Sequence, residues 1–165
     1  CHRYLLSELL GARNREGQYG GSFENRTRLA REIFQAIRSE LPDLMLTTRM
    51  NAFDGIPYQK GDDGLGEPVF APTPIENGWG IDRITPILAE LSEPIRWIKE
   101  MHSLGVALVN ITLGNPYAQP HFGRPFEYPP PDGYESPEHP LVGVDRHFKI
   151  AGVLQQSCPE LPMIG

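Results

Sequence analysis

The stretch Tyr19-Gly20-Gly21-Ser22-Phe23-Glu24-Asn25-Arg26 opens the first long helical pattern of the chain. Ser22 is a favourable N-cap, and Glu24 lies in the first turn, where the helix dipole stabilises a carboxylate. Apolar residues then recur every fourth position, at Leu29, Ile33, Ile37 and Leu41. Pro42 ends this pattern, and the apolar run at 44–50 is typical of a strand. The sequence therefore predicts a helix over about 23–41 followed at once by a strand.

Two further helix–strand units follow along the chain. The second helix begins near Arg83 or near Glu93, with its best-defined part at 94–104, and Gly105 ends it before a strand at 106–112. The third helix is expected at about 145–157, with a strand beginning near Leu161. The links from helix to strand are short, whereas the links from strand to helix, 51–80 and 114–144, are long. This asymmetry is typical of parallel α/β proteins whose function lies at the carboxyl ends of the strands.

The first strand favours a barrel over a doubly wound sheet. Leu46 and Thr48 share one face of that strand, and Thr47 and Arg49 share the other, which places an arginine on the inward face of a barrel. No Gly-x-Gly-x-x-Gly string follows any strand, so a dinucleotide-binding unit is not expected. A full barrel takes about 250 residues. We therefore expect an α/β fold that is a partial TIM (βα)8 barrel, about half of one.

Composition excludes several classes of protein. The formal net charge of −6 argues against a nucleic-acid-binding surface, and no apolar run is long enough to span a membrane. The first residues lack the pattern of a signal peptide, and Cys1 and Cys158 form neither a metal motif nor a disulfide framework. We expect free thiols, a cytoplasmic location and no bound metal. The chain starts without Met and stops in a short apolar run at Gly165, so we expect both ends to be those of a fragment.

The string at 19–26, with His2–Leu10 before it and a strand ending in Arg49 after it, resembles the old yellow enzyme family of NADH:flavin oxidoreductases. The resemblance implies a (βα)8 barrel that holds FMN at its carboxyl face and takes electrons from NADH or NADPH. It implies that residues 1–165 are a fragment of a single FMN-binding domain, from the end of strand 4 to the start of strand 7. The substrate would be a small molecule.

Three residues match functional positions of that family. His2 matches the second of two residues that hydrogen-bond the substrate oxygen, and its partner would precede Cys1. Tyr4 matches the tyrosine that protonates the substrate, and Arg49 matches the arginine that contacts the flavin ring. When a hydride reaches the β-carbon of an electron-poor alkene, a donor such as His2 stabilises the charge that develops on the conjugated oxygen. A phenol keeps its proton at neutral pH, which suits a general acid, and a permanent cation favours the anionic reduced flavin.

Each of these residues also has an ordinary interpretation. His2 is then a terminal histidine, Tyr4 a core aromatic, and Arg49 half of a structural salt bridge. In the long loop after 106–112, His121 and Arg124 suit substrate contact, or else a salt bridge with the acidic segment 132–138. The segment Glu24–Arg26 is better explained by capping and helix packing than by catalysis.

Two functions from different classes remain. The first is an FMN-dependent oxidoreductase of the ene-reductase type, with proton donation from Tyr4. The second is a cofactor-free half-barrel with a structural or self-associating role and no activity of its own. An aldolase-type barrel would need an inward Lys at a strand end, and neither strand has one. Open sheet edges in half a barrel make a homo-oligomer a further expectation.

Overall fold

A short parallel sheet forms the centre of the fold in the computed structural model, which describes residues 4–126 and 133–165. The strands are β1 (Leu46–Phe53), β4 (Val106–Leu113) and β5 (Met163–Ile164), in the order β1-β4-β5. Both pairings are parallel, with Arg49 beside Asn110 in the register of β1 and β4. The predicted parallel pairing of the first two strands is confirmed.

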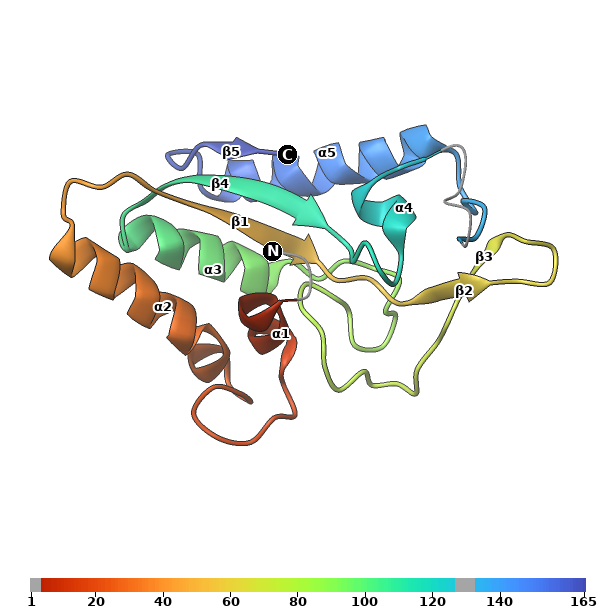
Figure 1. Cartoon of the computed structure of the whole chain (residues 1–165), viewed down its shortest axis with the longest axis horizontal. Helices are drawn as coiled ribbons and strands as arrows, with labels where there is room; N and C mark the ends of the chain where they lie inside the picture. The colour runs from red at the N-terminus through yellow and green to blue at the C-terminus, as the bar shows by residue number, and fades with distance from the viewer. Residues whose placement is uncertain (1–3, 127–132) are drawn as a thin grey trace.

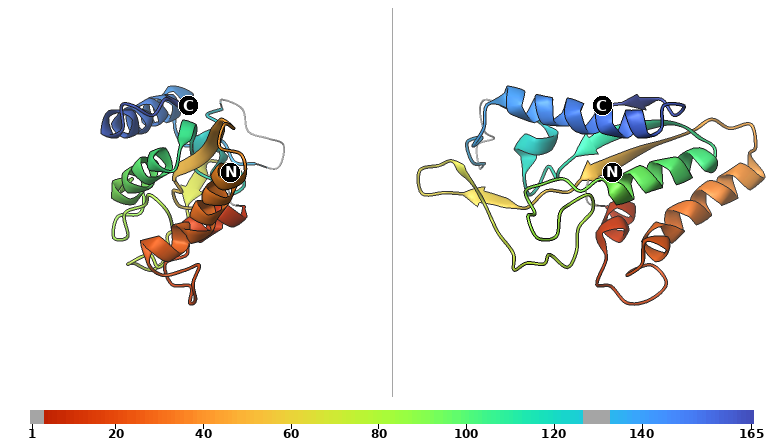
Figure 2. Two further views of the ribbon diagram at one scale, coloured as in Figure 1. Left: turned by 90° about the vertical axis from the view of Figure 1, so that its left-hand side faces the viewer. Right: turned by 180° about the vertical axis from the view of Figure 1, so that it is seen from behind.

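The three long helices lie in an arc on one side of this sheet (Figures 1 and 2). They are α2 (Phe23–Glu40), α3 (Ser92–Ser103) and α5 (Pro140–Ser157). The helix-facing side chains of β1 and β4, such as Met50 and Ile111, are buried in one apolar core with Ile98 of α3 and Leu154 of α5. On the opposite face of β1, Thr47 and Arg49 are exposed, whereas Asn51 and Phe53 near its carboxyl end are buried. One covered and one uncovered face confirm the expected placement of the helices.

The ends of the elements follow local chemistry. The Ser22 side chain accepts a hydrogen bond from the Asn25 amide at 3.2 Å and caps α2. Gly105 adopts a φ of +85° directly after α3, a backbone angle that glycine takes without strain. The prediction for the third helix was too short by five residues, because Pro140 occupies its first turn and His139 caps it. The first strand was likewise placed two residues early, at 44 instead of Leu46.

Four shorter elements were not predicted. They are helix α1 (Leu5–Gly11), the antiparallel hairpin of β2 (Tyr58–Lys60) and β3 (Gly66–Pro68), and helix α4 (Pro120–Gly123). The hairpin and α4 lie in the two long loops that follow β1 and β4, beyond the carboxyl ends of both strands (Figure 1). The long strand-to-helix connections are therefore structured. Three strands with helices on one face are compatible with part of an α/β barrel, and closure into a barrel stays a prediction.

Candidate active site at the carboxyl ends of the strands

Tyr4 and Arg49 line the same pocket, which has a volume of about 410 Å³. Its wall includes five consecutive residues of β1, 47–51, together with side chains of α1, α2 and α3. Successive strand residues point to opposite faces, so a pocket that touches all five runs along the edge of the strand. This is the edge away from β4, and within the described ranges no strand pairs with it.

The hydroxyl groups of Tyr4 and Tyr117 lie 3.3 Å apart. Tyr4 directly precedes α1, and Tyr117 belongs to the loop that follows β4, so the contact joins segments from the two sides of β1. Both rings are largely exposed, at 63% and 77%. The hydrogen bond with Tyr117 raises the pKa of the Tyr4 phenol, followed in size by the charge of Tyr117. Tyr4 is therefore held as the neutral, proton-carrying phenol.

Arg49 belongs to a polar chain that crosses the uncovered face of the sheet. Its Nε donates to Oδ1 of Asn110 at 2.5 Å, and Nδ2 of Asn110 donates to the carbonyl of Ile164 at 3.1 Å. These two hydrogen bonds link all three strands and hold the Nε end of the guanidinium in place. Because the partner of Arg49 is a neutral amide, its charge remains available to an anion. The partner expected under the salt-bridge interpretation would instead be a carboxylate.

Asp54 fastens the start of the loop after β1. Its carboxylate accepts from the Trp79 amide at 2.8 Å and from Nδ2 of Asn51 at 2.7 Å, and its own amide donates to the Trp79 carbonyl. Its carbonyl accepts a hydrogen bond from the Gln119 side chain, which belongs to the loop after β4. Asp54 is only 4% exposed. Asp54 therefore joins both long loops where they leave the sheet.

The other predicted site residues do not join this pocket. His2 lies outside the described residues. His121 is 1% exposed, with Nδ1 of its ring 2.7 Å from the Tyr134 hydroxyl and its ring edge-on to Tyr58. Burial lowers the pKa of His121 to about 4, so the ring is neutral at pH 7. It is a core residue of the loop in this structure, not a group exposed for substrate contact.

Arg124 is exposed just after α4. Within the described residues, the ion pair of the acidic segment joins it to α5 and not to this loop. Both terminal guanidinium nitrogens of Arg146, on α5, donate to the Glu138 carboxylate at 2.5 and 2.8 Å. The structure gives Arg124 no place in the pocket of Tyr4 and Arg49.

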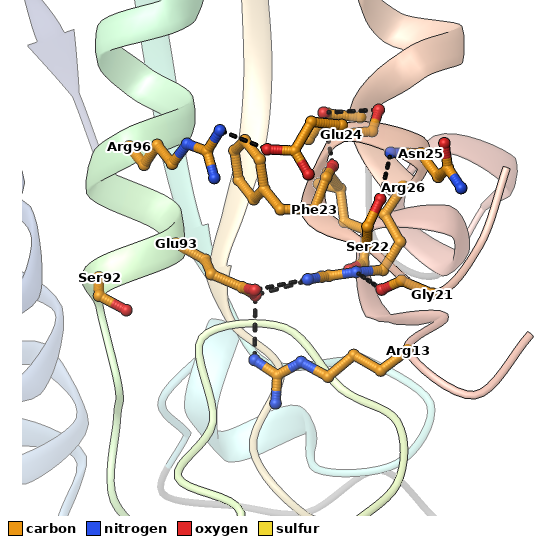
Figure 3. Close-up of polar contacts among 12 residues, drawn as sticks. Arg13, Gly21, Ser22, Phe23, Glu24, Asn25, Arg26, Ser92, Glu93 and Arg96 are labelled. Atoms are coloured by element: carbon orange, nitrogen blue, oxygen red, sulfur yellow. Dashed lines mark hydrogen bonds and ion pairs between the residues drawn. The ribbon is translucent and has the colours of Figure 1, made fainter. Parts of the chain in front are cut away.

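Arg26, at the start of α2, has a structural role, as the sequence predicted. Arg26 donates to the Glu93 carboxylate and to the carbonyls of Leu10 and Gly21, and Arg13 reaches the same carboxylate at 3.0 Å (Figure 3). These bonds tie α1, α2 and α3 together behind the site. They fix the helix that follows Tyr4.

Tyr117 and the pairing of Asn110 with Arg49 are the functional features that the sequence alone did not single out. Tyr117 follows Gly114-Asn115-Pro116 directly after a strand, and this position at a strand's carboxyl end is the signal that could have found it. Among the described residues, no three His, Cys, Asp or Glu side chains gather as metal ligands. Within the same residues, none of the helices has the length and apolar character needed to cross a membrane.

No family model matches the chain. It is 42% identical over 61 residues to a NADH:flavin oxidoreductase of Gibberella zeae. The match covers 35% of this chain and 15% of that relative, so it spans a small part of the relative's length. This is a partial similarity to a protein of the same class as the resemblance.

Proposed function

We propose that the chain is part of an FMN-dependent oxidoreductase barrel of the NADH:flavin oxidoreductase type, which reduces an electron-poor alkene or related acceptor. The observation that carries the proposal is the meeting of Tyr4 and Arg49 in one pocket. The resemblance assigned these two residues from separate motifs, one to proton donation and one to the flavin. The partial similarity to a NADH:flavin oxidoreductase supports the coarser class, a flavin oxidoreductase.

The cationic hydrogen-bond donor in this pocket, Arg49, fits a flavin. Arg49 is exposed on the uncovered face of the sheet, and its contact with the neutral Asn110 holds it in place without cancelling its charge. A permanent cation at this place favours the anionic reduced ring over the neutral oxidised ring. FMN, when bound, supplies the hydride transfer. Electrons would come from NADH or NADPH.

Tyr4 has the properties required of the proton donor. Its raised pKa keeps the phenol protonated at neutral pH, and its exposed position leaves the hydroxyl open to a bound substrate. The Tyr4 O–H bond breaks as a C–H bond forms at the substrate α-carbon, and solvent returns a proton to the tyrosine. His2 would hydrogen-bond the substrate oxygen, which remains a prediction from the resemblance.

The free edge of β1 supports the barrel part of the proposal. Within the described residues, no strand pairs with this edge. An unpaired strand edge is where a further strand of the sheet would be accommodated. Residues 1–165 would then be a fragment of one barrel domain.

The decisive experiment is Tyr4→Phe in the flavin-loaded barrel protein. Oxidation of the reduced flavin by an enone should slow by about 10²–10⁴-fold, the usual contribution of a general acid. Reduction by NAD(P)H should be unchanged, because the hydroxyl acts only when the α-carbon takes its proton. Stopped-flow absorbance of the flavin separates the two half-reactions. Wild-type speed in the enone step would remove Tyr4 as the donor.

Tyr19→Phe is the matched control for this experiment. The Tyr19 hydroxyl also makes a 3.3 Å hydrogen bond, to Glu32 of α2, but it lies outside the pocket. Both half-reactions should keep their rates in this variant. The alternative function, a cofactor-free half-barrel, predicts that the purified protein carries no flavin, which its visible absorbance reports directly.

A further inference from the structure

The loop after β4 is built to present Tyr117. Gly114 turns the chain with a φ of +67°, and its amide donates to the Phe53 carbonyl at 2.7 Å. The Asn115 side chain accepts from the Tyr117 amide at 2.8 Å, while its carbonyl accepts from the amides of Ala118 and Gln119. Asn115 is only 8% exposed.

The backbone of Tyr117 is therefore fixed, although its ring is exposed. The next residue, Ala118, receives a hydrogen bond from the Tyr58 amide at 2.8 Å, which ties the loop to strand β2. A largely exposed aromatic ring on a fastened backbone gains little from burial. Within the described part of the chain, its side chain hydrogen-bonds the Tyr4 hydroxyl. This contact, between residues far apart in the sequence, calls for a role at the site.

We infer that Tyr117 is a positioning residue of the reaction, whose hydroxyl hydrogen-bonds the Tyr4 hydroxyl and holds it at the mouth of the site. The inference rests on the proposed function, since it assigns Tyr117 a task only if Tyr4 donates the proton. Tyr4 precedes a short helix, and its own ring is 63% exposed, so little else restrains its hydroxyl. Tyr117 supplies that restraint from the opposite side of β1.

Three ionisable groups lie around Tyr4. Glu8 is on the same helix, Arg49 lies in the same pocket, and Tyr117 comes from the loop after β4. Among these, Tyr117 is the group that shifts the pKa of Tyr4, and it raises it.

Tyr117→Phe in the flavin-loaded barrel protein tests the inference. The enone half-reaction should slow by about three- to tenfold, the effect of losing one neutral hydrogen bond. The alkaline limb of its pH–rate profile should move to lower pH, because the group that raises the pKa of Tyr4 is gone. Reduction by NAD(P)H and flavin content should be unchanged. Tyr19→Phe again serves as the control.

The pH profile separates positioning from mere packing. A loss of packing would lower the rate without moving the alkaline limb, and an alkaline limb that stays in place overturns the inference. A shift to higher pH also overturns it, since the contact with Tyr117 would then lower the pKa of Tyr4 instead of raising it. If Tyr4→Phe itself has no effect on the enone step, the proposed function fails. If Tyr4→Phe slows the enone step and Tyr117→Phe keeps the wild-type rate and pH profile of that step, only the role of Tyr117 fails.

Discussion

The guanidinium of Arg26 lies 2.5 Å from the carboxylate of Glu93 and is 2% exposed, while Glu93 is 24% exposed. Arg26 also donates to the carbonyls of Leu10 and Gly21. Helices α1, α2 and α3 meet at this one buried side chain, which therefore controls how the helix after Tyr4 is seated against the sheet (Figure 3).

Arg26→Ala should destabilise the protein, because it leaves the Leu10 and Gly21 carbonyls without this donor. The partly buried Glu93 carboxylate would keep only its pair with Arg13. Breaking a fully buried ion pair costs about 3–5 kcal/mol of unfolding free energy, and the partial exposure of Glu93 and its remaining pair should keep the loss below that range. Lys149→Ala is the control, since its pair with Asp145 lies on the surface of α5 and contributes at most about 0.5 kcal/mol. Urea titration of both variants measures the difference. Equal stabilities would show that the Arg26 network is dispensable.

Gly80→Ala should also be destabilising, for a backbone reason. Gly80 has a φ of +62°, and an added Cβ would lie 2.0 Å from the Ala52 carbonyl oxygen of β1. The matched change is Gly152→Ala within α5, where an added Cβ meets nothing within 4 Å. That change should stabilise the helix by about 0.5–1 kcal/mol. Opposite shifts of the thermal midpoint are expected, and two shifts of the same sign would contradict this.

Acidification should weaken the fold through His121. Its pKa is about 4 in the folded protein, against 6.5 ordinarily, so the unfolded chain binds a proton at a higher pH than the folded one. The stability from keeping this ring neutral is complete above pH 6.5 and is lost as the pH falls towards 4. His121→Phe should flatten the fall in the unfolding midpoint over that range. Part of the fall will remain, since burial also lowers the pKa of His147. Equal slopes for the original protein and His121→Phe would show that His121 does not govern the acid response.

Arg49→Ala should weaken retention of FMN or make the flavin harder to reduce, because it removes a positive charge beside the reduced ring. Asn110→Ala should have the same effect in weaker form, since it removes only the group that holds Arg49. Flavin absorbance after gel filtration measures retention, and a redox titration measures the potential. Unchanged values in Arg49→Ala would exclude the assigned role.

The isolated 165-residue chain should self-associate. Within the described part of the chain, the edge of β1 that faces away from β4 has no partner strand. The side chains of Tyr4, Leu5 and Met45 are exposed at 63%, 63% and 73%. Open edges and apolar patches of this kind promote association. Sedimentation velocity over a range of concentrations tests this, and a monodisperse monomer at all of them would contradict it.

The sequence predicted the elements whose patterns are local and long. Ser22, the apolar stripe of α2 and Gly105 were sufficient for the helices, since caps and periodicity act over a few residues. The hairpin of β2 and β3 was missed because each strand has three residues, too few for a period to show. The contact between Tyr4 and Tyr117 could not be predicted from the sequence, because it depends on the register of β1 with β4.

Among the site residues, Arg49 was predicted from strand alternation and a motif, and the structure places it on the expected face. His121 was misplaced, because nothing in the local sequence reveals that Tyr58 and Tyr134, from other segments, cover it. The length of the loop suggested exposure, whereas tertiary packing decided burial. For a long loop with aromatic residues at both ends, burial by tertiary packing should therefore be considered beside exposure.

The fastening of both long loops at Asp54 has a consequence for how this scaffold can change over time. Asp54 binds Trp79 and receives the Gln119 side chain, so both loops are held where they leave the sheet. The hairpin tip at 61–64 closes on itself through hydrogen bonds of Gly61 with Leu65 and Gly64. Insertions and sequence drift at that tip would therefore leave Tyr4 and Arg49 undisturbed.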